Sequence, residues 1–214
     1  MTEKTVIIIP ARYASSRFEG KPLALLTGAT GAARSLIQRS WDTACEVPGV
    51  DDIFVATDDD RIAQAVRDFG GQVIMTSDTC RNGTERVAEA LQGLAAPADI
   101  VVNLQGDAPL TPPWFITGLI EEMKRDREVQ MATPVLQCDG HTLNMFIEDR
   151  RNGQVGGTTA VFDRNWDALY FSKEVLPFTD KLYAADAGTP VYHHVGAYAY
   201  RPKTLGQYVS WPEG

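Results

Sequence analysis

Short apolar runs alternate with helix-like patterns over the first 125 residues of the chain. The runs are rich in β-branched side chains, which is typical of strands buried on both faces; they lie at residues 6–9, 53–57, 73–76 and 100–104. Between them, apolar residues recur at helical spacing, which predicts a helix over residues 29–46 and three further helices. The buried faces of these three are expected to carry Ile62, Val66 and Phe69, then Val87, Leu91 and Leu94, then Ile116, Leu119, Ile120 and Met123. Such alternation predicts a parallel sheet with right-handed crossovers.

The pattern changes from Met131 onward. Irregular segments, including 139–154 and 179–189, separate strand-like runs at 131–135, 158–162, 168–172 and 191–200. We therefore predict an α/β fold with a mostly parallel central sheet, helices on both of its faces, and a smaller mixed-strand insertion. Because no segment reads as a linker, we expect residues 1–214 to form a single domain.

Several polar residues mark expected helix ends. The three aspartates at 58–60 suit either a metal site or a helix N-terminus. At a helix N-terminus, carboxylates accept hydrogen bonds from the free N–H groups, and we favour this capping role for most of the three. Asn82 and Glu85 have the spacing of a capping box. Thr111 is expected to cap the next helix, with Pro112 at its first position.

A basic loop follows the first strand, which we expect to end at Pro10 because proline has no N–H for the sheet. The loop carries Arg12, Arg17 and Lys21, and Gly20 permits close backbone approach. In open α/β sheets, ligands bind at the carboxyl ends of strands. Since Lys21 precedes a proline, the spacing of a Walker loop is absent, and side-chain cations would hold any phosphates. A solvated basic loop is the alternative.

Asp107 follows the strand at 100–104, directly after Gly106. An acid facing the basic loop could bind Mg²⁺ through its oxygens while the cations bind phosphate. A turn aspartate that hydrogen-bonds its own backbone explains the same position. Later in the chain, His193 and His194 point to opposite faces of a strand. Lys173 ends an apolar strand, where it would either bind an anion or simply be solvated.

Composition narrows the classes of function. The 214 residues carry a net charge of −8, which argues against extended contact with nucleic acid or an anionic membrane. The three cysteines show no zinc or disulfide spacing, and no apolar run approaches the ~20 residues of a membrane span. Met1 leads almost directly into the first strand, without a signal peptide. We therefore expect a cytoplasmic protein.

An ordered set of motifs resembles the 3-deoxy-manno-octulosonate cytidylyltransferases, the CMP-Kdo synthetases. The set covers most of residues 5–137 and 166–211. Its members are Ile9-Pro10-Ala11-Arg12-Tyr13-Ala14-Ser15-Ser16-Arg17, Gly20-Lys21-Pro22-Leu23, Val55-Ala56-Thr57-Asp58, Met75-Thr76, Gly83-Thr84-Glu85-Arg86, Asn103-Leu104-Gln105-Gly106-Asp107, Met131-Ala132-Thr133, Ala168-Leu169-Tyr170-Phe171-Ser172, His194-Val195-Gly196-Ala197-Tyr198 and Tyr200-Arg201. Each motif alone is weak, whereas the ordered set is specific.

The resemblance implies a nucleotide-diphospho-sugar transferase-like fold, usually dimeric. It implies that CTP and 3-deoxy-manno-octulosonate (Kdo) give CMP-Kdo and pyrophosphate with Mg²⁺, a step toward lipopolysaccharide. By the same resemblance, Arg12, Lys21 and Asp107 are catalytic, and Asp107 is the metal ligand. Nucleotide binding falls to Ala11, Arg12, Lys21, Asn82, Gly83 and Arg86, and sugar binding to Gln105, Lys173, His194 and Tyr198.

Departures from the family pattern cluster near the expected sugar and base sites. The chain has Cys80 for a histidine, Ala108 for a glutamate, and Lys173 and His193 for arginines. Activation of another 2-keto sugar acid, such as an amino-Kdo or a nonulosonic acid, is therefore a rival hypothesis. The family pattern also continues past Gly214 with a helix, a strand and a second metal carboxylate, so we expect the natural chain to continue. A non-catalytic nucleotide or sugar binder is the alternative if it does not.

Overall fold

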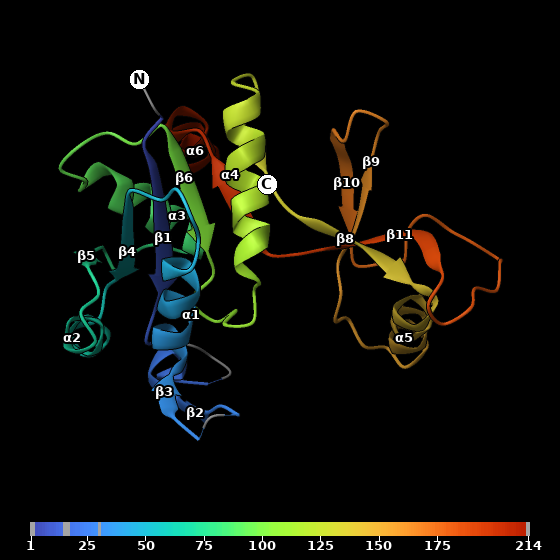
Figure 1. The fold of residues 1–214 in the computed structure, drawn as a ribbon, viewed down its shortest axis with the longest axis horizontal. Coiled ribbons are helices and arrows are strands. Elements are labelled where there is room, and N and C mark those ends of the chain that lie inside the picture. Colours follow the sequence, from blue (N-terminus) through green and yellow to red (C-terminus); the bar gives the residue numbers. More distant parts are fainter. Residues whose placement is uncertain (1–2, 15–17, 30, 213–214) are drawn as a thin grey trace. The chain divides into compact units, whose positions relative to one another are not determined.

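The computed structural model of the chain describes residues 3–14, 18–29 and 31–212. These form two compact units, the first comprising Met1–Ala132 with Ala197–Gly214 and the second Thr133–Gly196. Figure 1 labels their helices and strands. The second unit is inserted between β7 (Met131–Ala132) and β12 (Ala197–Tyr200), which pair with each other in the first unit.

A six-stranded sheet forms the centre of the first unit, in the order β5-β4-β1-β6-β12-β7. The strands β1 (Thr5–Ala11), β4 (Asp52–Thr57), β5 (Val73–Met75) and β6 (Ile100–Leu104) pair in parallel. β12 pairs antiparallel with both β6 and β7. The carboxyl ends of β1, β4, β5 and β6 therefore lie along one edge of the sheet, where ligands are expected.

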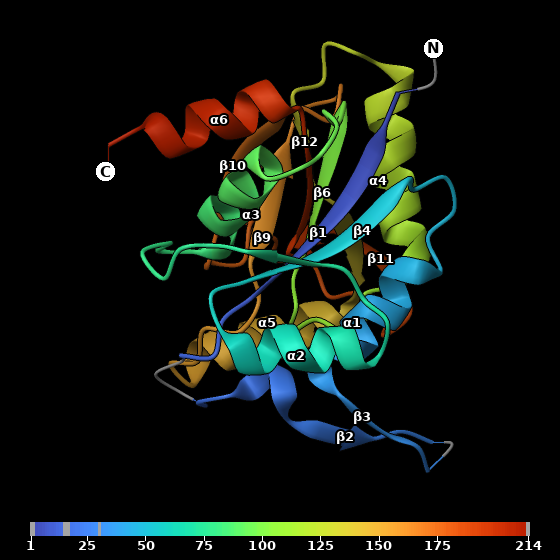
Figure 2. The same cartoon turned by 90° about the vertical axis from the view of Figure 1, so that its left-hand side faces the viewer.

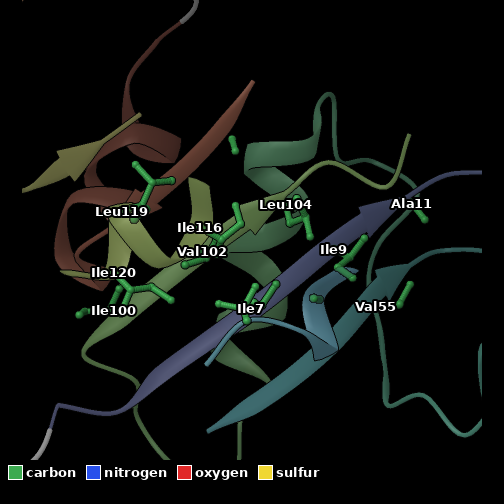
Figure 3. Packing of buried hydrophobic residues seen from close by; sticks show 14 of the residues in the cluster. Ile7, Ile9, Ala11, Val55, Ile100, Val102, Leu104, Ile116, Leu119 and Ile120 are labelled. Atoms are coloured by element: carbon green, nitrogen blue, oxygen red, sulfur yellow. The ribbon is translucent and has the colours of Figure 1, made fainter. Parts of the chain in front are cut away.

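Helices cover both faces of this sheet. α1 (Leu36–Cys45), α2 (Asp60–Asp68) and α4 (Pro113–Arg125) pack on the face that carries Ile7 and Ile9 of β1. Figure 3 shows Ile7 and Ile9 beside residues of β6 and α4. α3 (Gly83–Gln92) and α6 (Pro202–Ser210) pack on the opposite face, with Val6 and Ile8. In Figure 2, α3 and α6 lie on one side of the sheet and α4 on the other. The predicted fold class is confirmed.

No helix in the described ranges is long and apolar enough to cross a membrane.

The first unit differs from the sequence-based expectation at three element ends. β1 continues through Pro10 to Ala11. It pairs with β6 only as far as Ile8 and with β4 along its whole end, so Pro10 lies where β1 has one partner strand and its missing N–H is tolerated. The expected helix over 29–46 begins only at Leu36, where Ser35 caps it. Pro112, not Thr111, is the N-cap of α4.

A hairpin replaces the first part of that expected helix. It consists of β2 (Leu25–Thr27) and β3 (Ala33–Ser35), and its residues are mostly exposed. It is preceded by the short 3-10 helix η1 (Lys21–Leu23). Gly31 has a φ of +77°, a conformation that glycine adopts readily and that suits a tight turn.

The second unit is an antiparallel sheet with one helix. Its strands are β8 (Val135–Asp139), β9 (Thr159–Phe162), β10 (Ala168–Ser172) and β11 (Gly188–His194), in the order β10-β9-β11-β8. Cys138, Leu143 and Val191 form its buried apolar cluster. The expected mixed-strand insertion is therefore present.

Two boundaries of the second unit and one of its elements were predicted wrongly. The expected strand 131–135 is split into β7 and β8, and the expected strand 191–200 into β11 and β12. Both breaks are where the chain passes from one sheet to the other. The irregular segment 139–154 contains α5 (Gly140–Arg151), which Asp139 caps by accepting a hydrogen bond from the Thr142 N–H at 2.7 Å.

Candidate active site

The ends of β1 and β6 meet closely at one edge of the central sheet. A Cβ on Gly106 would lie only 2.7 Å from the Pro10 carbonyl oxygen and 3.3 Å from Ile37 Cδ1, so a residue with a side chain would not fit without a shift. The buried Ser40 hydroxyl donates to the Gly106 carbonyl oxygen at 3.1 Å. These contacts fix the backbone immediately before Asp107.

Lys21 and Asp107 meet at this edge. Lys21 Nζ lies 2.7 Å from Asp107 Oδ2, and the two side chains are 42% and 54% exposed. A solvent-exposed ion pair contributes little to stability, typically ~0–1 kcal/mol. Both groups therefore remain accessible to a ligand. The structure thus places the acid opposite one of the loop cations, as the sequence analysis expected.

The basic loop folds back on itself before it reaches Lys21. The Gly20 N–H donates to the Tyr13 carbonyl oxygen at 2.9 Å, and Gly20 has a φ of +68°. Ala11 is buried at the end of β1, and Arg12 after it is exposed. Arg17 lies outside the described residues. Among the loop cations that the structure describes, Lys21 donates a hydrogen bond to Asp107.

Arg61 is a further cation beside this loop that the sequence analysis did not single out. Its guanidinium carbon lies 3.3 Å from the centre of the Tyr13 ring. The same guanidinium donates to both carboxylate oxygens of Asp59, at 3.0 and 2.7 Å, and these bonds lower the pKa of Asp59. Asp59 also caps α2, as favoured for the acidic triplet. Only the folded structure reveals the Tyr13 contact, because no local motif joins the two residues.

The N-terminus of α3 lies against the ends of β1 and β6. Asn82 caps the helix by accepting from the Glu85 N–H at 3.0 Å, which confirms the cap expected there. A Cβ on Gly83 would lie 3.2 Å from Pro10 Cγ and 3.5 Å from Gln105 Oε1. A helix N-terminus favours anions. Asn82, Gly83 and Gln105 therefore belong to the same edge as Lys21 and Asp107.

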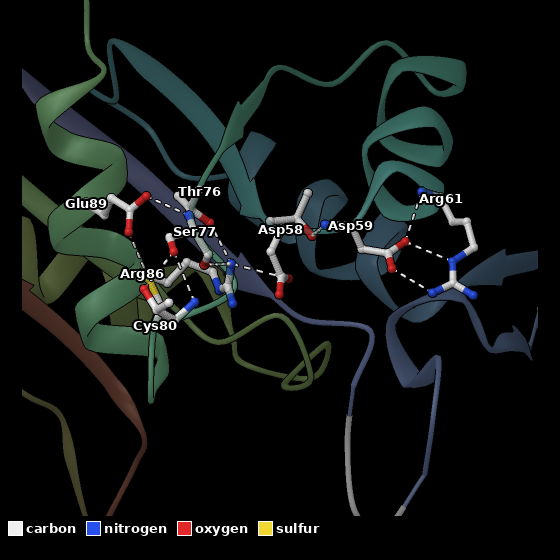
Figure 4. Close-up of polar contacts among 10 residues, drawn as sticks. Asp58, Asp59, Arg61, Thr76, Ser77, Cys80, Arg86 and Glu89 are labelled. Carbon is white, nitrogen blue, oxygen red and sulfur yellow. Dashed lines mark hydrogen bonds and ion pairs between the residues drawn. The ribbon is translucent and has the colours of Figure 1, made fainter.

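Arg86 is buried beneath this helix end and is held by protein groups (Figure 4). Its side chain is 3% exposed; Nη1 donates to Thr76 Oγ1 at 2.5 Å and lies 3.3 Å from Asp58 Oδ1. These contacts join α3 to the ends of β4 and β5. A direct contact between Arg86 and a nucleotide stays a prediction.

Glu89 ties down the segment between β5 and α3. Its carboxylate accepts from the Ser77 N–H at 2.6 Å and from Cys80 Sγ at 3.0 Å (Figure 4). Burial, together with the hydrogen bond to Glu89, raises the pKa of Cys80 to about 11. Cys80 is therefore a neutral thiol at physiological pH, held as a donor to Glu89 and poorly suited to act as a nucleophile.

Gln105 and Tyr198 are connected through β6. Gln105 Nε2 donates to Asn103 Oδ1 at 3.0 Å, and Asn103 is opposite Tyr198 in the β6–β12 register. Burial raises the pKa of Tyr198. Since opposite residues in an antiparallel pair share a face, Asn103 and Tyr198 lie on the same side of the sheet.

The other two predicted sugar-binding residues lie in the second unit. Lys173 Nζ donates to Thr158 Oγ1 at 2.7 Å. His194 Nε2 is 2.9 Å from Thr133 Oγ1, and its ring lies 4.8 Å from that of Phe171. Burial, followed by repulsion from His193 and Lys173, lowers the pKa of His194. His194 therefore favours its neutral form near pH 7.

Metal binding at this edge of the sheet would depend on Asp107. No group of three or more histidine, cysteine, aspartate or glutamate side chains in the described ranges could enclose an ion. Mg²⁺ commonly binds through one or two carboxylates together with substrate phosphates and water. The accessible carboxylate of Asp107, with Lys21 beside it, fits that mode of binding.

Comparison with known proteins agrees with the motifs. Residues 6–213 match the family described as cytidylyltransferase. A 3-deoxy-manno-octulosonate cytidylyltransferase from Maricaulis maris is 50% identical over 198 residues, covering 92% of this chain and 73% of that protein. One of the same name from Chlamydia trachomatis serovar L2 is 41% identical over 212 residues, covering 99% and 76%.

Solved structures agree with the fold. A structure of CMP:2-keto-3-deoxy-manno-octonic acid synthetase complexed with CTP superposes with a TM-score of 0.82 at 36% identity, covering 99% of this chain and 79% of the other. A cytidylyltransferase from Leptospira borgpetersenii, at 17% identity and a TM-score of 0.60, shares the fold. With a matching family, close relatives and a matching fold, the chain belongs to the 3-deoxy-manno-octulosonate cytidylyltransferases of the cytidylyltransferase family.

Proposed function

We propose that the chain is a nucleotidyltransferase that transfers CMP from CTP to the anomeric hydroxyl of Kdo and releases pyrophosphate. The observation that carries this proposal is the Lys21–Asp107 pair, 2.7 Å apart and accessible at the carboxyl edge of the sheet. Two relatives named 3-deoxy-manno-octulosonate cytidylyltransferase match 92% and 99% of this chain at 50% and 41% identity. CTP as the nucleotide is supported by the CTP complex of the similar synthetase.

The chemistry is an in-line displacement at the α-phosphorus. The sugar hydroxyl oxygen forms a bond to that phosphorus, its proton passes to solvent or a nearby base, and the bond to the β-phosphate oxygen breaks. Negative charge gathers on the phosphate oxygens, where preorganised cations stabilise the transition state. Lys21 and Arg12 would supply those cations. Mg²⁺, which Asp107 would ligate, would neutralise charge on the same oxygens when bound.

The remaining predicted residues divide by unit. Ala11, Asn82 and Gly83, at the ends of β1 and α3, would accommodate the nucleoside, with Arg86 beneath them. The family resemblance assigns sugar binding to Gln105 and Tyr198, which lie in the first unit, and to Lys173 and His194, which lie in the second. Each of these assignments remains a prediction. Lys173 is the residue suited to a carboxylate, because an ammonium group presents three hydrogen-bond donors on a flexible stem.

Three further expectations follow from the family resemblance. These are assembly into a homodimer, location in the cytoplasm, and supply of an activated sugar for lipopolysaccharide. Each remains a prediction.

A different 2-keto sugar acid is the alternative acceptor of CMP. Lys173 and His193 replace arginines of the family pattern, and both lie in the second unit beside His194. A point charge replaces a bidentate fork at Lys173, which alters recognition of a carboxylate. Another 2-keto sugar acid, such as an amino-Kdo or a nonulosonic acid, is therefore the alternative substrate.

The test is pyrophosphate release by the full chain, with each nucleoside triphosphate, each sugar acid, and with or without Mg²⁺. We expect turnover with CTP, Kdo and Mg²⁺. Lys21→Ala and Asp107→Ala should each lower kcat/KM by about a hundredfold or more, because removal of one transition-state contact often costs ~2.7–4 kcal/mol. Lys203→Ala, which removes an exposed lysine of α6, is the matched control. Unchanged kcat/KM in both site variants would contradict the proposal, and turnover with another acid but not Kdo would select the alternative.

A further inference from the structure

Asn103 is an unusual residue for the middle of a sheet. It lies in β6 between β1 and β12, and its side chain is 0% exposed. Its Oδ1 accepts a hydrogen bond from Gln105 Nε2 at 3.0 Å. Its Nδ2 is buried and has no hydrogen-bond partner in the described part of the chain.

An unpartnered donor is unfavourable in a core. A buried polar group without a partner loses its hydration, whereas an apolar side chain of the same shape does not. The flanking β6 residues Val102 and Leu104 are apolar and fully buried. Packing alone therefore does not explain an asparagine at this position. The hydrogen bond from Gln105 to its side-chain oxygen does.

That bond sets which end of the Gln105 amide is available. Nε2 is engaged by Asn103, so Oε1 is the end left to accept from another group. Oε1 lies beside the N-terminus of α3, within 3.5 Å of the position that a Cβ on Gly83 would occupy. Gln105 is only partly buried, so its free end is accessible at the edge that carries Lys21 and Asp107.

We propose that Asn103 is a positioning residue that fixes the Gln105 amide with Oε1 presented as the acceptor for a hydroxyl of the sugar acid. The inference rests on the proposed function, in which Gln105 binds that sugar. Asn103 itself contacts no substrate. An acceptor in fixed orientation favours a hydroxylated ligand at this point, because a hydroxyl can donate to it.

The experiment is a double-mutant cycle in the full chain between Asn103→Leu and Gln105→Ala. We expect Asn103→Leu to lower kcat/KM for the sugar acid about tenfold, or about 1.4 kcal/mol, while KM for CTP stays within about twofold. In the Gln105→Ala background, Asn103→Leu should cause no further loss. The melting temperature of the single variant Asn103→Leu should equal or exceed that of the parent protein, because an unpartnered donor is removed. Asn103→Val serves in the same cycle if the leucine variant does not fold.

Thr5→Val is the matched control. Thr5 is also 0% exposed, and its Oγ1 is also buried, with no hydrogen-bond partner among the described residues. It lies in β1 opposite Ile100, at the other end of the strands from Gln105. Its replacement should leave all kinetic constants unchanged.

Several outcomes would overturn the inference. Full activity of Asn103→Leu beside a weakened Gln105→Ala would show that Gln105 needs no positioning. Losses that add in the double variant, or an effect confined to KM for CTP, would show that Asn103 acts by another route. An unaffected Gln105→Ala would remove the basis of the inference while leaving the proposed function to the Lys21 and Asp107 variants.

Discussion

The two units of the chain differ in how much apolar core each contains. In the first unit, every residue of β1 is buried, and apolar clusters lie on both faces of the sheet. In the second, the buried cluster consists of Cys138, Leu143 and Val191, and four of the five residues of β10 are exposed. Elements with few buried contacts open locally at low free energy. We infer that packing holds the residues of the first unit, whereas polar bonds and ring contacts hold those of the second.

Truncation of one core residue in each unit is the strongest test of this comparison. Ile9→Ala should lower the free energy of unfolding by about 4 kcal/mol and Leu143→Ala by about 2 kcal/mol, because a densely packed site relaxes less around the cavity. Ile9 and Leu143 are 0% and 2% exposed. Denaturant titration gives both values.

Hydrogen exchange followed by mass spectrometry completes that test. Leu143→Ala should speed amide exchange within 133–196 and leave β1 protected, whereas Ile9→Ala should speed exchange in the whole first unit. Equal losses of unfolding free energy in the two variants, together with amide exchange that speeds up uniformly along the chain, would contradict the difference between the units.

Gly106→Ala should have an intermediate effect. The added methyl would lie 2.7 Å from the Pro10 carbonyl oxygen, and overpacking of this kind typically costs ~1–3 kcal/mol. Since the same backbone carries Asp107, kcat should fall as well. Gly118→Ala is the control, because Gly118 is exposed in α4 with open space around it, and alanine there should add up to ~1 kcal/mol of stability. Equal melting temperatures for the two variants would refute the tight contact at Gly106.

The smallest expected effect concerns the Cys80 thiol. Its pKa is raised from 9.0 to about 11, so the folded state favours the neutral thiol. Its stabilising contribution is therefore complete below pH 9 and is lost as the pH rises from 9 through 11. At pH 8, iodoacetamide should label Cys80 about tenfold or more slowly in the folded chain than in the unfolded chain.

Glu89→Gln tests how much of that shift comes from Glu89, in addition to the larger effect of burial. The variant removes the carboxylate that accepts from the thiol, so the pKa of Cys80 should fall and labelling should accelerate. Peptide mapping distinguishes Cys80 from Cys45 and Cys138. Equal labelling of folded and unfolded chains would argue against a held thiol.

The same contrast between the units explains what the sequence could predict. The strands and helices of the first unit bury one or both faces, so their periodicity is clear in the sequence. In α5 the fully buried residues are Gly140 and Leu143, with partly buried Phe146 and Ile147 beside them, so its apolar face spans little more than one turn and was missed. The hairpin β2–β3 is mostly exposed, so burial imposes no pattern on its sequence. The break at Val195-Gly196 was missed because it depends on which sheet each half joins.

The candidate site divides in a similar way. The meeting of Lys21 and Asp107 was predictable, because the carboxyl ends of neighbouring parallel strands share an edge. The stacking of Arg61 on Tyr13 and the burial of Arg86 against Asp58 were not, because each joins residues from separate elements without a local motif. Polar contacts at long sequence separation need coordinates.

The pairing of Ala132 with Ala199 has a consequence for how this enzyme family can diversify. Residues directly opposite each other in an antiparallel pair lie ~4.5–5.5 Å apart, so the chain leaves and re-enters the first unit at almost the same point. A tight turn could bridge that distance, and so could a different inserted module. Exchange of residues 133–196 between relatives is therefore expected to leave the strand order of the first unit intact, and it would test whether the proposed sugar contacts of Lys173 and His194 set the choice of acceptor.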